Sequence, residues 1–200
     1  MTKIKICGLS RLCDIEAVNE EKPDFIGFVF AESRRRVTPQ QAMKLREKLH
    51  TEIAAVGVFV NERKENIINL ITNGIIDSIQ LHGVEDEEYI RKLKLLTDKA
   101  IIKAITVQNT GDVQRWNDTS ADFLLLDNHG GGTGKLFDWE LIGEAGKPYF
   151  LAGGLCPENV REAIRKTTPF AVDASSGVEN GGLKDPVKIR EFIRRVRNEY

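Results

Sequence analysis

The chain has 200 residues, of which 41% are hydrophobic and 30% charged, and its formal net charge is −1. These values are typical of a soluble globular protein, and the near balance of charge gives no support to a nucleic-acid or membrane-surface role. No apolar run approaches the roughly 20 residues that cross a bilayer, and the first residues lack the apolar core of a signal peptide. The three cysteines have no CxxC spacing, which indicates neither a disulfide framework nor a zinc site. We therefore expect a reduced, cytoplasmic protein without membrane or nucleic-acid partners.

Short β-branched apolar runs alternate with longer stretches of helical spacing along the whole chain. The runs predicted as strands are Lys3–Cys7, Asp24–Phe30, Ile53–Val60, Asp77–His82, Ala100–Thr106, Asp122–Asp127, Pro148–Ala152 and Phe170–Ser175. The stretches predicted as helices are Cys13–Glu20, Pro39–Leu49, Glu62–Thr72, Asp86–Leu96, Asn109–Asn117, Asp138–Gly143, one opening at Pro157 and one opening at Asp185. Thr38 and Gln41 around Pro39 form a capping-box pattern. Eight βα units predict an α/β fold, a single (β/α)8 TIM barrel domain over residues 1–200, in preference to a doubly wound open sheet.

Two reactive side chains end strands of this barrel. Cys7 ends the first strand and Asp127 the sixth, so both are expected at the rim where βα loops gather the chemistry of such folds. A thiol and a carboxyl facing one cleft fit a base and an acid for proton transfer. The simpler alternatives are a buried structural cysteine and an aspartate that caps a loop or binds a cation.

The alternation of the first strand places Lys5 on the same face as Cys7, inside the barrel. A buried ammonium needs a partner, and Asp173 in the eighth strand, adjacent once the barrel closes, is the candidate. The ammonium is also expected to favour the thiolate form of Cys7.

Glycine and serine turns follow the seventh and eighth strands, where barrels often bind phosphate through backbone N–H groups. The residues concerned are Gly153, Gly154, Ser176 and Gly177. Either turn alone is explained equally well by the ordinary turn preference of glycine. Together they predict a phosphorylated small molecule as the substrate.

Other polar groups are expected above the same rim. Arg35, within the run Arg34–Arg36, is placed to form a forked contact with a substrate carboxylate, although such a run is usually solvated surface. His82 ends the fourth strand and is a candidate substrate contact, although a lone histidine is more often structural. The glycine-rich segment 130–135 is predicted to be a lid that excludes water, and His129 beside it receives no role.

An ordered set of short motifs spans residues 3 to 179 and resembles the phosphoribosylanthranilate isomerases of the tryptophan pathway. The motifs are Lys5-Ile6-Cys7-Gly8, Gly27-Phe28-Val29-Phe30, Ser33-x-Arg35-x-Val37-x-Pro39, Val56–Asn61, Gln80-Leu81-His82-Gly83, Leu126-Asp127 before Gly132-Thr133-Gly134-Lys135-x-Phe137-Asp138-Trp139, Ala152–Leu155 with Pro157–Val160, and Val172-Asp173-x-Ser175–Glu179. Each motif is weak alone, and the ordered set is specific. Arg34 departs from the proline that many members have there.

The resemblance implies a barrel that uses no metal or organic cofactor and catalyses an Amadori rearrangement of N-(5′-phosphoribosyl)anthranilate. By position, Asp127 would be the general acid at the furanose ring oxygen and Cys7 the general base at C2, while Arg35 would contact the anthranilate carboxylate. The glycine and serine turns would hold the phosphate. Anthranilate itself is implied only by the resemblance, and the oligomeric state is left open between monomer and homodimer.

Two other functions fit parts of this pattern. A histidine-pathway ProFAR isomerase, or a dual-specificity relative, would more typically place aspartates at the ends of strands one and five, where this chain has Cys7 and Thr106. A non-catalytic phosphate-binding barrel would not need the Cys7–Asp127 pair.

Overall fold

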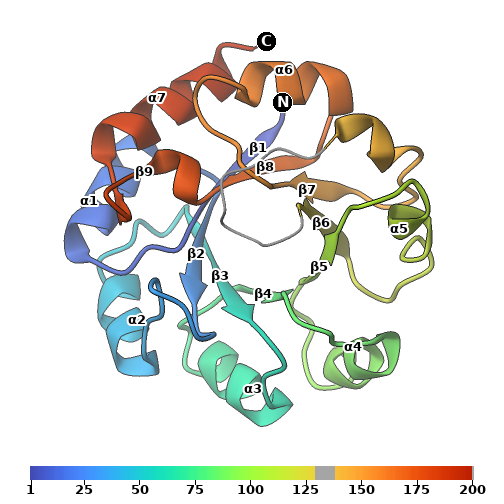
Figure 1. Ribbon diagram of the computed structural model, residues 1–200. Helices are drawn as coiled ribbons and strands as arrows, with labels where there is room; N and C mark the ends of the chain where they lie inside the picture. The colour runs from blue at the N-terminus through green and yellow to red at the C-terminus, as the bar shows by residue number, and fades with distance from the viewer. Residues whose placement is uncertain (129–137, 200) are drawn as a thin grey trace.

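The computed structural model describes residues 1–128 and 138–199, and in this part of the chain eight parallel strands close into a barrel in sequence order (Figure 1). The strands are β1 (Lys3–Cys7), β2 (Phe25–Val29), β3 (Ala54–Phe59), β4 (Ser78–Leu81), β5 (Ile101–Thr106), β6 (Phe123–Asp127), β7 (Tyr149–Leu151) and β8 (Ala171–Ala174). All eight predicted strands are therefore present, and the predicted (β/α)8 barrel is confirmed.

Helices surround the barrel (Figure 1). They are α1 (Leu12–Glu21), α2 (Pro39–Arg46), α3 (Lys64–Thr72), α4 (Glu87–Lys94), α5 (Gly111–Gln114), α6 (Val160–Thr167), α7 (Pro186–Arg197) and the 3₁₀ helices η1 (Trp139–Ile142) and η2 (Ser176–Val178). The predicted capping box is present, because the Gln41 N–H donates to the Thr38 hydroxyl and the Gln41 amide accepts from the Thr38 N–H. None of the helices in the described residues is long and apolar enough to span a membrane.

Two predicted helices differ from the structure. The stretch predicted as Asn109–Asn117 is helical only over α5, where the Asp112 carboxylate accepts from the N–H groups of Gln108 and Asn109 and so stabilises the preceding turn. The stretch predicted as Asp138–Gly143 forms only η1, which ends where Gly143 adopts a positive φ of 56°. After β5 and β6, short turns and a 3₁₀ helix therefore take the place of the longer predicted helices.

Four phenylalanines fill the end of the barrel opposite the rim. Phe25, Phe123 and Phe170 lie at or next to the starts of their strands and pack on Phe150, or on one another, with ring centroids 4.7 to 5.6 Å apart. Aromatic contacts of this kind contribute about 0.5–1.5 kcal/mol per pair beyond the area they bury. This apolar filling leaves the carboxyl ends of the strands for polar side chains.

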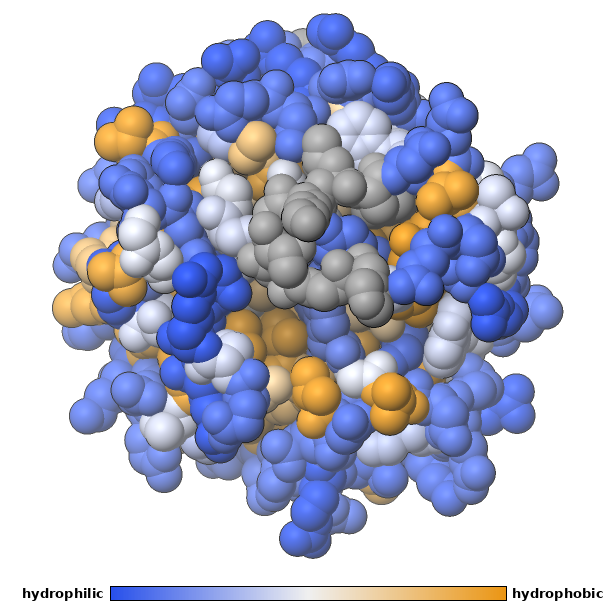
Figure 2. Space-filling model, in the orientation of Figure 1, coloured by the Kyte–Doolittle hydropathy of each residue, from blue (hydrophilic) through white to orange (hydrophobic). Residues whose placement is uncertain are grey.

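A small antiparallel hairpin after η2 was not predicted. Its strands are β9 (Glu179–Asn180) and β10 (Leu183–Lys184), joined by Gly181 and Gly182, whose positive φ values of 57° and 85° suit a tight two-residue turn. Figure 1 shows the hairpin between α1 and α7, beside the barrel mouth. Figure 2 shows mainly hydrophilic residues on the surrounding helices of this face.

Candidate active site

A cavity of about 290 Å³ lies at the carboxyl ends of the strands and is lined by most of the residues predicted for the site. The predicted residues that line it are Cys7, Arg35, His82, Asp127, Gly153, Gly154 and Ser176. The eighth, Gly177, lies behind this lining, where an added Cβ would be 2.0 Å from the Leu155 carbonyl oxygen. The structure therefore brings residues from six different strands or their following loops to one mouth.

Two glycines make room for the side chains of Cys7 and Arg35. A Cβ on Gly27 would lie 2.6 Å from the sulfur of Cys7, and a Cβ on Gly8 would lie 2.5 Å from Cδ of Arg35. Gly8 also has a φ of 83°, which a residue with a side chain rarely adopts. Both glycines are therefore explained by close approach of a functional side chain.

The predicted Lys5–Asp173 pair is confirmed. Lys5 lies opposite Asp173 in the β1–β8 register, and its Nζ is 2.8 Å from Oδ2 of Asp173. Lys5 is fully buried. Burial by itself would lower the pKa of Lys5, but Asp173 and Cys7 outweigh it and leave that pKa raised, so Lys5 is charged inside the barrel.

The predicted effect of Lys5 on Cys7 is present, but burial of the thiol outweighs it. Burial raises the pKa of the Cys7 thiol and is the largest influence, while Lys5 acts in the opposite direction and Asp173 raises the pKa further. The net shift is upward from 9.0. Lys5 therefore favours the thiolate as expected, but its effect does not overcome the burial of Cys7.

Asp127 is in contact with the backbone and with His82. Its Oδ1 accepts from the Asn128 N–H at 2.8 Å, and its Oδ2 is 3.5 Å from Nε2 of His82. The amide Nε2 of Gln80 is 2.8 Å from Nδ1 of His82. If the amide donates here, the proton of the neutral imidazole is on Nε2, the nitrogen that faces Asp127. Gln80, which the sequence analysis did not single out, thus supports His82 from the same strand.

Arg35 is bound by a carboxylate of the chain itself. Its Nε and Nη2 donate to the two oxygens of Glu179 at 2.6 and 3.0 Å, and this hydrogen bonding raises the pKa of Arg35. Nζ of Lys184 is 2.6 Å from the same carboxylate. Glu179 belonged to a recognised motif, but no role was predicted for it or for Lys184.

The turn after β7 is shaped by two left-handed glycines and one asparagine. Gly153 and Gly154 have φ values of 79° and 76°. Asn159 donates to the Gly154 carbonyl at 3.0 Å and accepts from the Cys156 N–H at 2.9 Å. Within the described part of the chain, no hydrogen bond is formed by the N–H groups of Gly153 and Gly154. These donors are therefore available to an anion.

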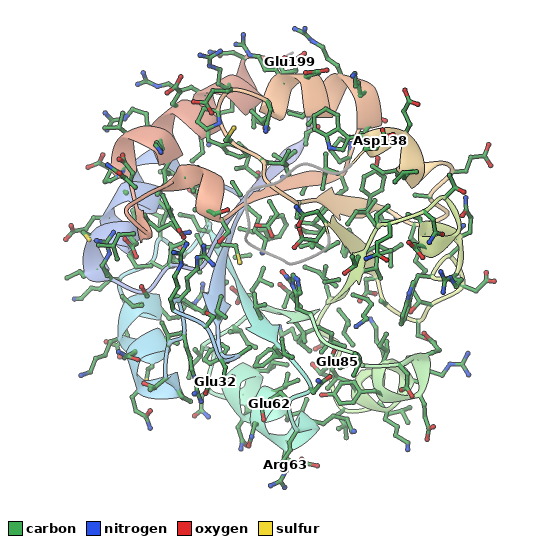
Figure 3. All side chains as sticks on the ribbon, viewed as in Figure 1. Glu32, Glu62, Arg63, Glu85, Asp138 and Glu199 are labelled. Carbon is green, nitrogen blue, oxygen red and sulfur yellow. The ribbon has the colours of Figure 1, made fainter. Side chains whose placement is uncertain are left out.

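A second buried ion pair orders the loop next to His82. Nζ of Lys103 is 3.1 Å from Oε2 of Glu85 and also donates to the Gly83 carbonyl at 2.7 Å. Glu85, labelled in Figure 3, accepts from the backbone N–H groups of Asn61 and Gly83. The pair ties the loops after β3 and β4 together and so fixes the backbone that follows His82.

Some of the sequence predictions are not addressed by this geometry. His129 and the glycine-rich segment 130–135, predicted as a lid, lie outside the described residues. Over residues 1–128 and 138–199, no group of three or more His, Cys, Asp or Glu side chains is placed to hold a metal ion.

The amino-acid sequence matches a known protein family over nearly its whole length. The family model for N-(5′-phosphoribosyl)anthranilate (PRA) isomerase matches residues 4–195. The chain belongs to this family. A PRA isomerase from Endomicrobium trichonymphae is 46% identical over 202 residues, which cover 99% of this chain and 100% of the relative. Membership in the PRA isomerases also decides against the ProFAR isomerase alternative.

Solved PRA isomerase structures share the whole fold. The Thermus thermophilus enzyme superposes with a TM-score of 0.90 at 31% identity and covers 100% of both chains. The Thermotoga maritima enzyme gives 0.89 at 39% identity and covers 99% of this chain and all of its own. A further PRA isomerase structure, with a TM-score of 0.86 and 37% identity over 99% of this chain and 100% of its own, is a complex with reduced 1-(o-carboxyphenylamino)-1-deoxyribulose 5-phosphate.

Proposed function

We propose that this chain converts N-(5′-phosphoribosyl)anthranilate into 1-(2-carboxyphenylamino)-1-deoxyribulose 5-phosphate, with Asp127 as general acid and Cys7 as general base. The observation that carries the proposal is that a PRA isomerase family member places this thiol and this carboxyl in the lining of one cavity, together with a guanidinium and residues of the turns after β7 and β8. The reaction is an intramolecular aldose–ketose isomerisation.

The first step opens the sugar ring. The Asp127 carboxyl gives its proton to the furanose ring oxygen while the bond from C1 to that oxygen breaks, and the anthranilate nitrogen lone pair forms a protonated C1=N Schiff base. His82 and the Asn128 N–H orient the carboxyl for this transfer. Positioned proton transfer of this kind contributes about 10²–10⁴-fold to a rate.

The second step removes the proton from C2. The Cys7 thiolate takes this proton, the C–H electrons form the C1=C2 bond, and the C1=N electrons return to nitrogen to give an enolamine. Tautomerisation then moves a proton to C1 and leaves a ketone at C2. Because burial raises the pKa of Cys7, only a minor fraction of the enzyme carries the thiolate at neutral pH, and Lys5 keeps that fraction from falling further.

The two ends of the substrate are anionic, and the cavity offers cations and N–H donors for them. We assign the anthranilate carboxylate to Arg35, which lines the cavity beside Cys7. We assign the phosphate to the turns after β7 and β8, through Gly153, Gly154 and the neighbourhood of Ser176. Holding both ends places C1 and C2 between the acid and the base.

The test is the decay of phosphoribosylanthranilate fluorescence with the purified protein. Cys7→Ser and Asp127→Asn should each lose at least ~10²-fold in kcat, the scale of general acid–base catalysis. Arg35→Ala should act mainly on kcat/KM, because it removes a binding contact. Cys13→Ser, which changes an exposed thiol on α1, is the matched control and should retain normal activity. Full activity in either catalytic variant would overturn the assigned role.

A further inference from the structure

We propose that Glu179 and Lys184, the two ends of the β9–β10 hairpin, are positioning residues that couple the carboxylate-binding end of the site to its phosphate-binding end. The inference rests on the proposed function, since it concerns how Arg35 and the turn after β8 are held. Neither residue lines the cavity. Their effect would therefore be exerted through the groups that do.

Glu179 is a buried carboxylate on which three cations converge. Its Oε1 accepts from Nε of Arg35 and from Nζ of Lys184, each at 2.6 Å. Its Oε2 accepts from Nη2 of Arg35 at 3.0 Å and from Nη2 of Arg34 at 2.8 Å. Only 7% of Glu179 is exposed, so these contacts are sheltered from solvent. A surface ion pair would be weak, whereas this one holds its partners in a fixed geometry.

The contact uses one edge of the Arg35 guanidinium and leaves the other. Nε and Nη2 face Glu179, and in the described part of the chain no hydrogen bond uses Nη1. A guanidinium presents its donors in a rigid plane, so fixing one edge also fixes the direction of the other. Glu179 therefore acts as the support from which Arg35 can bind a substrate carboxylate with its remaining edge.

Lys184 extends the same network to the other end of the site. Its Nζ donates to the Ser175 carbonyl at 2.9 Å, in the loop that carries Ser176. The hairpin itself is held from both sides: Arg11 donates to the Lys184 carbonyl, and Lys188 donates to the Glu179 carbonyl, each at 2.8 Å. One carboxylate thus joins the loop after β2 to the loop after β8 through a braced strand pair (Figure 1).

The charges of the network favour an anionic ligand. Arg34, Arg35 and Lys184 bring three positive charges to the single negative charge of Glu179. Burial would raise the pKa of Glu179, but hydrogen bonds from Arg35 and Lys184 outweigh it and lower that pKa. Burial lowers the pKa of Lys184, and Glu179 opposes this only in part. The charged form of Glu179 is stabilised more than that of Lys184, because Glu179 has several cationic partners. Among the described residues, Lys184 has only one carboxylate partner, and it is repelled by Arg35. A net positive charge remains for a substrate with a carboxylate and a phosphate.

The test separates the two ends of the site. Glu179→Gln keeps the shape of the side chain and removes its charge, and should raise KM for phosphoribosylanthranilate about ten-fold or more while kcat changes much less. Anthranilate and inorganic phosphate serve as separate probes, with binding followed by calorimetry. Both probes should bind at least several-fold more weakly to Glu179→Gln. Arg36→Ala, which removes a neighbouring exposed guanidinium that pairs with Glu32 and not with Glu179, is the matched control and should change each constant by less than about three-fold.

A merely structural role would leave different results. If Glu179 only stabilised the fold, the folded fraction of Glu179→Gln measured by circular dichroism would fall, while KM and both probe affinities of the folded protein would stay normal. That result would overturn the inference. If unpaired Lys184 prevents that variant from folding, Glu179→Gln with Lys184→Met removes both charges and should still raise KM. Normal probe affinities in this double variant would overturn the inference. Wild-type protein that binds both probes but does not turn over the substrate would instead refute the proposed function.

Discussion

The Lys5–Asp173 ion pair gives the sharpest prediction for stability, through the substitution Lys5→Met. The two atoms are 2.8 Å apart and Lys5 is fully buried. At an effective dielectric constant of about 20 their attraction is on the order of 6 kcal/mol. Desolvation of the two ions costs several kcal/mol each, so the intact pair contributes little net stability. Removing Lys5 alone is different, because it leaves the Asp173 carboxylate buried without its cation.

We expect Lys5→Met to lower the free energy of unfolding by about 3–5 kcal/mol, the usual cost of breaking a buried pair from one side. In a chain of 200 residues this corresponds to a fall in Tm of roughly 6–20 °C. The matched control is Lys5→Met with Asp173→Asn, which removes both charges and should recover most of the loss. Denaturant unfolding followed by circular dichroism measures both variants.

The same substitution has an electrostatic consequence for Cys7. Since Lys5 lowers the pKa of the thiol, its loss should move the acidic limb of the kcat/KM profile to higher pH. The reasoning would be refuted if the free energy of unfolding of Lys5→Met were within about 1 kcal/mol of the wild-type value. It would also be refuted if the acidic limb of the kcat/KM profile were unchanged in folded Lys5→Met protein.

Three further predictions concern other parts of the site. Gly27→Ala should lower kcat at least about ten-fold with a modest change in KM, because the new Cβ displaces the Cys7 sulfur; steady-state kinetics with normal values would refute it. Glu179 has a lowered pKa, so the stability it contributes is present above its ordinary value of 4.5 and is lost as the pH falls below that value through the folded-state pKa. The stability gap between wild type and Glu179→Gln should therefore narrow on acidification, and a gap that is constant from pH 7 to about pH 3 in urea unfolding would contradict this. Lys103→Met should lower the free energy of unfolding by about 3–5 kcal/mol in the same assay, because it leaves the buried Glu85 carboxylate without its cation. A loss below about 1 kcal/mol, as for a surface ion pair, would contradict this.

The barrel is predictable from the sequence because local apolar patterns decide which side chains face the helices and which face the barrel interior. The alternation in β1 sends Ile4 and Ile6 toward the helices and Lys5 into the barrel, and closure then brings Asp173 beside it. The strand ends, marked by Cys7 and Asp127, follow from the same pattern. The shortened α5 and the 3₁₀ helix η1 were harder to predict, since turns built by Asp112 and Gly143 compete there with weak helical spacing.

The errors at the site have a different cause. The partner of Arg35 lies 144 residues away on an unpredicted hairpin, and nothing around Arg35 in the sequence indicates Glu179. The sequence placed Lys5 near Cys7 but gave no measure of how deeply both are buried, and burial decides the direction of the thiol pKa. Gln80 left a usable signal, namely a polar residue on the inward face of a strand that leads to His82.

The role of Cys7 as the base of the rearrangement is tested most directly by the pH dependence of kcat/KM for Cys7→Asp. The ordinary pKa values of a thiol and a carboxyl differ by about 4.6 units. If the side chain at this position removes the C2 proton, the acidic limb of the profile should move down by at least about 2 pH units, even if the rate is lower. An acidic limb that stays where the wild-type enzyme has it would show that another group takes the proton.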